Sequence, residues 1–319
     1  MAMPVEITAV ICTRNRVHFL EKCLRSLLRQ TLAVDRCEII VVDNGSTDQT
    51  AELVERIAAT EPHVRYVHEP VIGLSRARNT GWRMATANIV GYIDDDAVAG
   101  ERWLEDALWC FGNIRPAPTW VGGPIDLEWE VPNPGWIDDE LAVPLGRVHW
   151  GDTPRSLSHP ERLGGGNGFF DRGWLERLGG FDERLGRQGA SLLSGEETQL
   201  QQRIEAAGGF LYYHPGVHIR HYVPAERTRP AWFFRRYFWG GVSDYFMSRT
   251  LVGTATGTAD CSPASTGSAS RAGRLMRNLI CSLGLGVTRT RTIHARIYLA
   301  YVVGWLSGAC RWRDTTATR

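Results

Sequence analysis

The chain has 319 residues, enough to bury the core of one large domain or one and a half. Its 36 basic and 35 acidic residues leave a net charge of +1, which argues against a nucleic-acid-binding protein because no general positive field would collect a polyanion. Seven scattered cysteines without a Cys-x-x-Cys pair indicate reduced thiols in a cytoplasmic protein. The apolar run at residues 5–12 is too short for a signal-peptide core, so we expect no secretion.

Four apolar runs in the first hundred residues predict the strands of an α/β fold. They lie at residues 5–12, 38–43, 64–68 and 89–93. The segments between them are long enough for crossover helices, and the first places Leu20, Leu24 and Leu27 at helical spacing. This alternation predicts a doubly wound, mostly parallel central sheet flanked by helices.

Polar side chains follow three of these predicted strands. They are Thr13, Arg14 and Asn15 after the first, Asp43 and Asn44 after the second, and Asp94, Asp95 and Asp96 after the fourth. The carboxyl ends of parallel strands meet at one edge of a sheet, where such folds bind ligands. Asp43 could accept hydrogen bonds from a base or ribose, and Thr13 and Arg14 could position a base and diphosphate. Asn15 could instead be a helix cap, and Asn44 part of an ordinary turn.

The three consecutive aspartates are the strongest chemical signal. Carboxylates crowded at a strand end repel one another unless a cation neutralises them. A hard divalent ion that holds phosphate oxygens fits this pattern, although an acidic turn or a helix cap would also account for it.

A further helix is expected to begin at Gly73. Its first turns contain Arg76 and Asn79, and helix amides together with guanidinium groups suit a phosphate or ribose. The segment lacks the G-x-G-x-x-G and G-K-[ST] patterns, so neither a dinucleotide fold nor a P-loop is supported.

Four of these motifs together resemble the family 2 glycosyltransferases. They lie at residues 10–16, 41–48, 75–81 and 92–96, and the resemblance extends to about residue 245. It implies a GT-A fold that binds a nucleoside-diphosphate sugar, with a UDP-sugar favoured, and Mg²⁺ or Mn²⁺ as cofactor. It also implies that Asp94 faces the ribose or the metal and that Asp96 is the main carboxylate ligand.

The middle of the chain is expected to build the sugar and acceptor side. Residues 132–160 are rich in proline and aperiodic, which predicts a long loop over the site. Glycines at 164–166 allow the backbone to approach a ligand closely. The segment resembles the glycine-rich segment of the family, in which the asparagine, here Asn167, lies near the donor sugar.

Two adjacent glutamates, Glu196 and Glu197, open a predicted helix. Their placement favours the helix dipole without any catalysis. The family resemblance implies a general base here, where its Gly-Glu-Asp motif ends in an aspartate. Glu197 occupies that position with one additional methylene, and Glu196 is the reserve candidate.

Downstream of the glutamates, His218 and His221 lie three residues apart. No cysteine or further histidine has zinc-finger spacing, so a structural zinc site is improbable. The family resemblance implies that His221, just before the Tyr-Val-Pro run, completes the metal site, whereas His218 is structural. Arg227 or Arg229 could close on the leaving diphosphate.

These inferences predict a metal-dependent hexosyltransferase that acts on a hydroxyl of a glycan, lipid carrier or small natural product, and the family resemblance implies that it inverts the anomeric configuration. The alternatives are a non-catalytic sugar-nucleotide-binding scaffold and a nucleotidyltransferase, although the latter would want a glycine-rich phosphate loop after the first strand. The catalytic domain is expected at residues 1–250, with a nucleotide-binding half at 1–120 and an acceptor half at 121–250.

Residues 251–270 are rich in small and polar side chains and predict a flexible linker. Residues 271–319 mix apolar runs with arginines and predict a helical extension. Its apolar portion, residues 297–310, is shorter than the about 20 residues of a membrane span. The extension could lie peripherally on the inner face of a membrane, dock on the catalytic domain, or form a homodimer.

Overall fold

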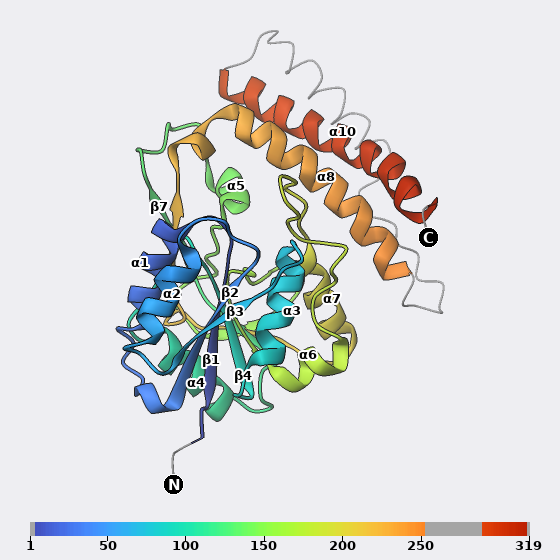
Figure 1. Ribbon diagram of the computed structural model, residues 1–319. Coiled ribbons are helices and arrows are strands. Elements are labelled where there is room, and N and C mark those ends of the chain that lie inside the picture. The colour runs from blue at the N-terminus through green and yellow to red at the C-terminus, as the bar shows by residue number, and fades with distance from the viewer. Residues whose placement is uncertain (1–3, 253–288, 318–319) are drawn as a thin grey trace. The chain divides into compact units, whose positions relative to one another are not determined.

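The computed structural model describes residues 4–252 and 289–317 (Figure 1). The chain divides into two compact units. The first contains the residues up to Glu130, Asp139–Arg184 and Glu196–Val223, and the second contains Val131–Asp138, Leu185–Gly195 and the residues from Pro224 onward. All but two residues of the predicted linker lie outside the described residues, as do residues 271–288 of the predicted extension.

The first unit is built on an eight-stranded sheet of order β3-β2-β1-β4-β9-β6-β10-β8. Its strands are β1 (Ile7–Thr13), β2 (Cys37–Asp43), β3 (Val64–His68), β4 (Ile89–Asp94), β6 (Trp120–Gly122), β8 (Arg155–Leu157), β9 (Asn167–Asp171) and β10 (Leu211–Tyr213). Strands β3, β2, β1 and β4 are mutually parallel, whereas β9 runs antiparallel to both β4 and β6. The four predicted strands are confirmed, each within two residues of its expected ends.

Helices cover both faces of this sheet because the side chains of each central strand alternate between two cores. Ile7, Ala9 and Ile11 of β1 pack in one hydrophobic cluster, and Val10 packs in the other. The α-helices of this unit are α1 (Val17–Leu27), α2 (Thr50–Ala58), α3 (Leu74–Met84), α4 (Trp103–Asn113), α5 (Asp139–Ala142), α6 (Arg172–Leu178) and α7 (Glu196–Ala206), with short 3₁₀ turns η1 (Val34–Arg36) and η2 (Val143–Leu145). Buried side chains of α1, α2 and α4 share the first cluster, and those of α3, α6 and α7 share the second.

A second, three-stranded sheet of order β5-β11-β7 follows the aspartate triplet. Its strands are β5 (Ala97–Ala99), β7 (Ile125–Trp129) and β11 (Ile219–Val223). Strand β11 runs antiparallel to β5, with His221 opposite Ala97. Because β5 begins directly after Asp96, this register brings a histidine from late in the chain beside the aspartates.

The second unit contains η3 (Ala225–Thr228) and two long helices, α8 (Pro230–Val252) and α10 (Arg289–Ala317). The helices run side by side (Figure 1) and approach closely at glycines. A Cβ on Gly241 would lie 2.1 Å from the Tyr301 carbonyl oxygen, and Gly308 lies against Tyr245, so the pairing is parallel. Within the described part of the chain, no helix combines the length and apolar character needed to cross a membrane.

Candidate active site

The carboxyl ends of β1, β2 and β4 converge as the sequence predicts. In the sheet register Thr13 lies opposite Asp43, and Cys12, one residue before Thr13, lies opposite Asp94. The polar residues that follow each strand therefore share one edge of the sheet, which is the ligand-binding edge of open α/β folds.

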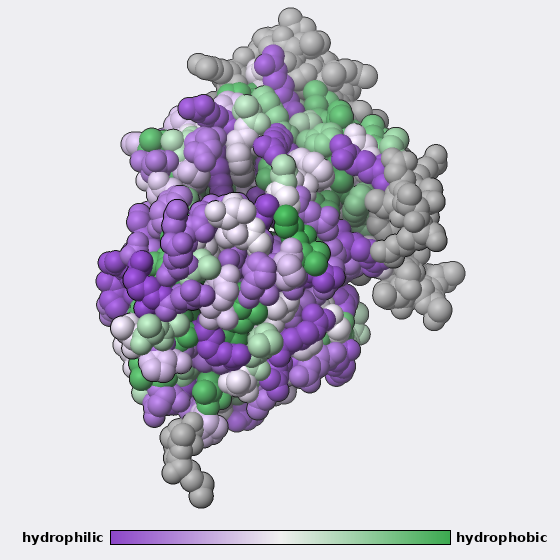
Figure 2. Space-filling view, in the orientation of Figure 1, coloured by the Kyte–Doolittle hydropathy of each residue, from purple (hydrophilic) through white to green (hydrophobic). Residues whose placement is uncertain are grey.

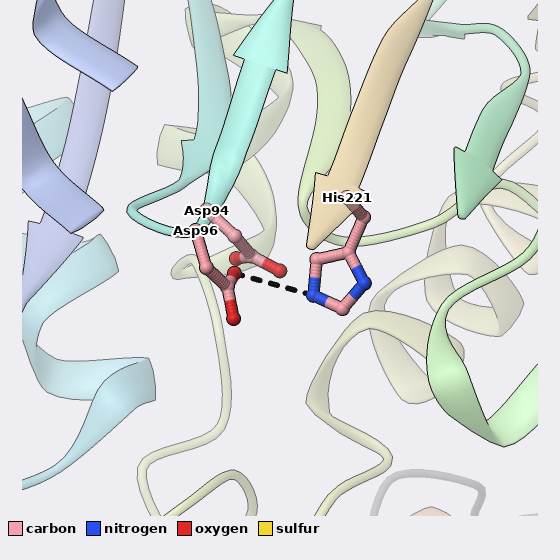
Figure 3. Close-up of side chains that lie close together, drawn as sticks. All are labelled: Asp94, Asp96 and His221. Atoms are coloured by element: carbon pink, nitrogen blue, oxygen red, sulfur yellow. Dashed lines mark ion pairs between the residues drawn. The ribbon is translucent and has the colours of Figure 1, made fainter. Parts of the chain in front are cut away.

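Asp94, Asp96 and His221 form a cluster at this edge (Figure 3). Each offers one ligand atom, and these atoms all lie within 4.8 Å of one another. The Nε2 atom of His221 lies 3.2 Å from Oδ1 of Asp96. Two carboxylates with one imidazole form a donor set that suits Mn²⁺ or Mg²⁺, so the side chains present fit the divalent ion that the sequence implies.

Arg16 neutralises part of the aspartate cluster, which sequence reasoning did not foresee. Its guanidinium lies 2.8 Å from Oδ1 of Asp95 and 2.6 Å from Oδ2 of Asp96. Asp95 also accepts a hydrogen bond of 2.7 Å from the Thr13 hydroxyl. Burial raises the pKa of Asp95 to about 7, although Arg16 acts to lower it. Thr13, predicted to position a base and diphosphate, thus contacts Asp95 within the acidic cluster.

A second missed cation, Arg78, connects Asp94 to the two glutamates. Arg78 is buried on α3, and its Nη1 lies 2.7 Å from Oε1 of Glu196 while its Nη2 lies 3.7 Å from Oδ1 of Asp94. The predicted Arg76 is two residues earlier and therefore on another face of the helix, where it pairs with Glu183 at 2.9 Å. The spacing of Arg76 and Arg78 was the available signal in the sequence. Two residues that are two positions apart on a helix point in different directions, so only one of these arginines can face the sheet edge.

Glu196 and Glu197 lie in the first turn of α7, as predicted. Burial and repulsion from Glu197 raise the pKa of Glu196 to about 7, although Arg78 acts to lower it. Glu197 is half-buried, and its Oε2 has no hydrogen-bond partner among the residues that the structure describes. Oε2 of Glu196 also lacks such a partner, so the two carboxylates differ in burial and in the ion pair with Arg78, which holds Glu196.

The glycine-rich segment lies against these carboxylates. A Cβ on Gly166 would lie 2.2 Å from Oδ2 of Asp94, and a Cβ on Gly165 would lie 3.0 Å from the Cβ of Glu197. Neither position has space for a side chain, so the close approach expected of these glycines is to Asp94 and Glu197. They hold the two carboxylates near one backbone segment.

Asn167 has a structural environment that differs from the donor contact expected of it. It is fully buried, and its Nδ2 donates to the carbonyl oxygens of Pro124 and Val217. Its Oδ1 accepts a hydrogen bond from Trp103 Nε1. With both ends of the amide engaged in the core, Asn167 is suited to anchoring the glycine segment rather than contacting a sugar.

Asn79 is likewise turned inward. Its Nδ2 donates to the Phe181 carbonyl oxygen and to Glu183, and its Oδ1 accepts from Phe181 N and Trp82 Nε1. The predicted donor contact of Asn79 is not supported by this arrangement, because every hydrogen-bonding atom of its amide has a protein partner.

Asp43 and Asn44, at the carboxyl end of β2, hold the loops at the ligand-binding edge of the sheet. Asp43 accepts hydrogen bonds from Ser46 N and from the Tyr66 hydroxyl, each at 2.8 Å. Asn44 donates to the carbonyl oxygens of Glu69 and Val71 and accepts from Gly73 N, so it holds the segment that leads into α3. These hydrogen bonds fix the position of the Asp43 carboxylate that a base or ribose would contact.

Asn15 and Arg14 differ in their surroundings. Asn15 has a positive φ of 54°, and its Oδ1 accepts a hydrogen bond from Thr47 N across the edge. It is therefore not a cap of α1, whose N-cap residue is Arg16. Arg14 is half-buried, and its Nε lacks a hydrogen-bond partner within the described residues, which leaves a donor for a ligand.

The remaining predicted residues lie apart from this cluster or in the second unit. His218 is 2.9 Å from Asp126 at the surface, as its expected structural role requires. Arg227 belongs to η3 of the second unit, so its role as a clamp stays a prediction. From the predicted loop, Gly146 reaches the site, because a Cβ there would lie 3.2 Å from Nδ1 of His221.

Comparison with known proteins shows a similarity to glycosyltransferases. The glycosyl transferase family 2 profile matches residues 8–111. A glucosyl-dolichyl phosphate glucuronosyltransferase of Haloferax volcanii is 25% identical over 246 residues, covering 76% of this chain and 77% of that enzyme. A validoxylamine A glucosyltransferase of Streptomyces hygroscopicus subsp. jinggangensis is 33% identical over 118 residues, but the match covers only 36% of this chain and 28% of that enzyme.

Solved structures show the same architecture. The mannosyltransferase PcManGT from Pyrobaculum calidifontis, in complex with GDP-Man and Mn²⁺, superposes with a TM-score of 0.60 at 19% identity, covering 96% of this chain and 87% of that one. GalNAc-T7 with UDP, GalNAc and Mn²⁺ gives 0.54 at 17% identity, over 81% of this chain and 53% of that one. At these identities the likeness concerns the fold. Together with the profile match over residues 8–111 and the enzyme relatives, it supports a family 2 glycosyltransferase, and the architecture matches that of GT-A glycosyltransferase structures.

Proposed function

We propose that this glycosyltransferase moves a sugar from a nucleoside-diphosphate sugar, with a UDP-sugar as the leading candidate, to an acceptor hydroxyl with inversion at the anomeric carbon. One observation carries the proposal: Arg78 lies between Asp94 of the candidate metal cluster and Glu196 of the glutamate pair. The groups suited to a leaving diphosphate and to an attacking hydroxyl are thus joined through one buried guanidinium.

Asp94, Asp96 and His221 would hold Mn²⁺ or Mg²⁺, and the ion would neutralise charge on the departing diphosphate. Two similar structures contain Mn²⁺ with a nucleotide or nucleotide sugar, which supports this assignment. Asp43 and Arg14 are the proposed contacts to the nucleoside and diphosphate. Their place at the converging strand ends supports that role.

Glu197 is the proposed general base. Both glutamates keep Oε2 without a hydrogen bond to any described residue, but Glu196 is buried and committed to its 2.7 Å ion pair with Arg78, whereas Glu197 is only half-buried. Glu197 takes the proton of the acceptor hydroxyl while that oxygen attacks the anomeric carbon, and the bond from this carbon to the diphosphate oxygen breaks. A single displacement of this kind inverts the configuration.

The acceptor class is left as a glycan, a lipid carrier or a small natural product. The two relatives described above have names that refer to a dolichyl phosphate and to validoxylamine A, a lipid-linked and a small-molecule compound. Both kinds present a hydroxyl that a glutamate could deprotonate, so the proposed chemistry does not choose between them.

The test is a donor screen with three proteins: wild type, Glu197→Gln and Glu196→Gln. Each is mixed with Mn²⁺, a panel of UDP-, GDP- and dTDP-sugars and candidate acceptors, and nucleoside diphosphate release is followed. We expect metal-dependent release by wild type and a loss of about 10²–10⁴-fold in Glu197→Gln with donor binding retained. The anomeric coupling constant in the NMR spectrum of the product reports the configuration.

The glutamine variants distinguish the two carboxylates. If Glu196→Gln loses turnover to that extent while Glu197→Gln retains it, the base is Glu196. Donor binding by wild type with no release in the presence of any acceptor would favour a sugar-nucleotide-binding scaffold. Retained configuration in the product would exclude the single displacement.

A further inference from the structure

The two parts of the sequence carry opposite charge, although the whole chain is nearly neutral. Residues 224–319 contain fourteen arginines and four acidic residues, a net charge of +10, which leaves −9 for residues 1–223. Within residues 261–313 there are eight arginines and no aspartate or glutamate. A segment of this composition attracts anionic surfaces and repels a copy of itself.

The helix α10, which lies in this basic segment, exposes an apolar row. Leu299, Val303, Leu306 and Cys310 recur at spacings of four, three and four, which places them along one side of a helix. Val303 is 54% exposed and Leu306 is 57% exposed. Figure 2 shows hydrophobic patches among the hydrophilic side chains over α8 and α10.

This row faces away from α8. Gly304 and Gly308, which contact Phe238 and Tyr245 of α8, lie on the other side of α10. Arg296 is exposed near the start of the row, whereas the exposed Arg311 at its end places its guanidinium 5.2 Å from the ring centre of Trp239 on α8. The side of α10 that faces away from α8 therefore combines aliphatic side chains with the neighbouring guanidinium of Arg296.

We propose that the apolar row of α10, defined as Leu299, Val303, Leu306 and Cys310, docks on an anionic lipid surface. An aliphatic row beside an exposed arginine, in a strongly basic segment, is suited to lie at the boundary between acyl chains and headgroups, where apolar burial and attraction to anionic lipid act together. A second copy of the chain fits less well, because it would bring two strongly basic segments together. Nucleic acid also fits less well as a partner, because its charged backbone would not bury the apolar row. The proposal does not rest on the transfer reaction.

The experiment is sedimentation of the full chain with vesicles of phosphatidylcholine alone or mixed with phosphatidylglycerol. We expect the protein to sediment with the anionic vesicles, to remain in solution with the neutral ones, and to be released by high salt. The double variant Val303→Ser/Leu306→Ser should bind the anionic vesicles at least about tenfold more weakly, because two exposed apolar side chains are lost.

Two controls keep the result specific. The variant Val34→Ser/Val143→Ser removes aliphatic side chains that are 61% and 62% exposed in the first unit, and it should bind as wild type does. The variant Arg296→Gln, which removes an exposed positive charge beside the row, should weaken anionic binding without unfolding a helix. Equal sedimentation with both vesicle types, no sedimentation, or an unaffected Val303→Ser/Leu306→Ser variant overturns the proposal. So does a wild-type dimer in light scattering that this double variant dissociates, since the row would then be an interface between copies.

Discussion

Arg78 lies buried between Asp94 and Glu196, and it acts against the rise that burial causes in the pKa of Glu196. Because that pKa is raised to about 7, Glu196 should take up a proton and weaken its ion pair with Arg78 as the pH falls below about 7, and kcat/KM should fall with it. The rise of kcat/KM with increasing pH is the ascending limb of the pH profile. Replacing Arg78 by Met removes the cation that lowers the pKa of Glu196, so it should move this limb to higher pH. The measurement is kcat/KM for nucleoside diphosphate release across the pH range.

Arg83→Met is the matched control for this substitution. Arg83 is exposed on the same helix and stacks on Trp82, so its loss should leave the limb in place. Arg78→Lys, which keeps a positive charge, should keep the limb closer to that of wild type than Arg78→Met does. An ascending limb that is unchanged in Arg78→Met would show that Glu196 does not control the profile.

Single residues at the site were predictable to the extent that their chemistry follows from local sequence. Asp94 and Asp96 could be identified because three carboxylates at a strand end are unusual, and His221 came from the family resemblance. Arg16 and Arg78 were missed because their partners lie 80 and 118 positions away in the sequence. The inward orientation of the Asn79 and Asn167 amides could not be predicted either, since the sequence does not show which way an asparagine within a helix or after a glycine run points.

At the scale of elements, Glu38 joins β2 to its neighbours. It accepts hydrogen bonds from Thr8 of β1, from Thr86 before β4, and from Arg65 of β3. Burial acts to raise the pKa of Glu38, but these hydrogen bonds outweigh burial and lower it overall. The stabilisation is therefore present above the carboxyl's unfolded pKa and is lost as the pH falls through the folded value.

Glu38→Gln should lower the free energy of unfolding by about 1–3 kcal/mol at pH 7, because the charged hydrogen bonds are lost in a buried position. The difference from wild type should shrink in acid, where Glu38 is protonated. Urea unfolding at both pH values measures this. Glu21→Gln removes a surface partner of Arg25 and should change stability by less than about 0.5 kcal/mol. A Glu38→Gln effect that is equally large in acid would mean that shape, and not charge, accounts for it.

The pairing of α8 and α10 depends on glycine at the crossing. A Cβ on Gly304 would lie 1.8 Å from the Phe238 carbonyl oxygen, which is backbone and cannot rotate away. Gly304→Ala should therefore separate the helices and destabilise their unit by about 1–3 kcal/mol. Gly112→Ala is the same change in α4 with no atom within 4 Å, and it should be neutral or stabilising by up to about 1 kcal/mol. Thermal unfolding of both variants decides the matter, and equal midpoints would mean that the crossing tolerates a side chain.

Elements differed in how far their sequence specified them. The long apolar strands β1, β2, β3 and β4 were predictable because buried parallel strands read as continuous apolar runs. Strands β6 and β8 have three residues each, too few for a period to be detected. The register of β11 against β5, which places His221, depends on contacts made only after the sheet has formed.

At the scale of the whole molecule, the alternation of strands and helices in the first hundred residues was sufficient to predict a doubly wound, mostly parallel sheet, whereas the GT-A fold was implied by the family resemblance. The same pattern did not reveal that the sheet changes direction at β9, or that the chain leaves and re-enters the first unit at residues 131–138 and 185–195. Such excursions are loops in the sequence, without a periodic pattern, and their assignment to a unit follows from packing alone.

Binding of a ligand at the proposed donor site should be measurable as an increase in the free energy of unfolding of the whole protein. A ligand that binds only the folded state raises the free energy of unfolding by about 2.7 kcal/mol at a hundred times its Kd, or about 5 °C in the unfolding midpoint of a chain of this size. We expect UDP with Mn²⁺ to produce such a rise and each alone to produce less, because the diphosphate and the carboxylates of Asp94 and Asp96 share the ion. Asp96→Asn should abolish the rise, whereas Asp126→Asn, which alters a surface partner of His218, should keep it. If Asp96→Asn is stabilised by UDP and Mn²⁺ as strongly as wild type, the ion is not held by the Asp94, Asp96 and His221 cluster.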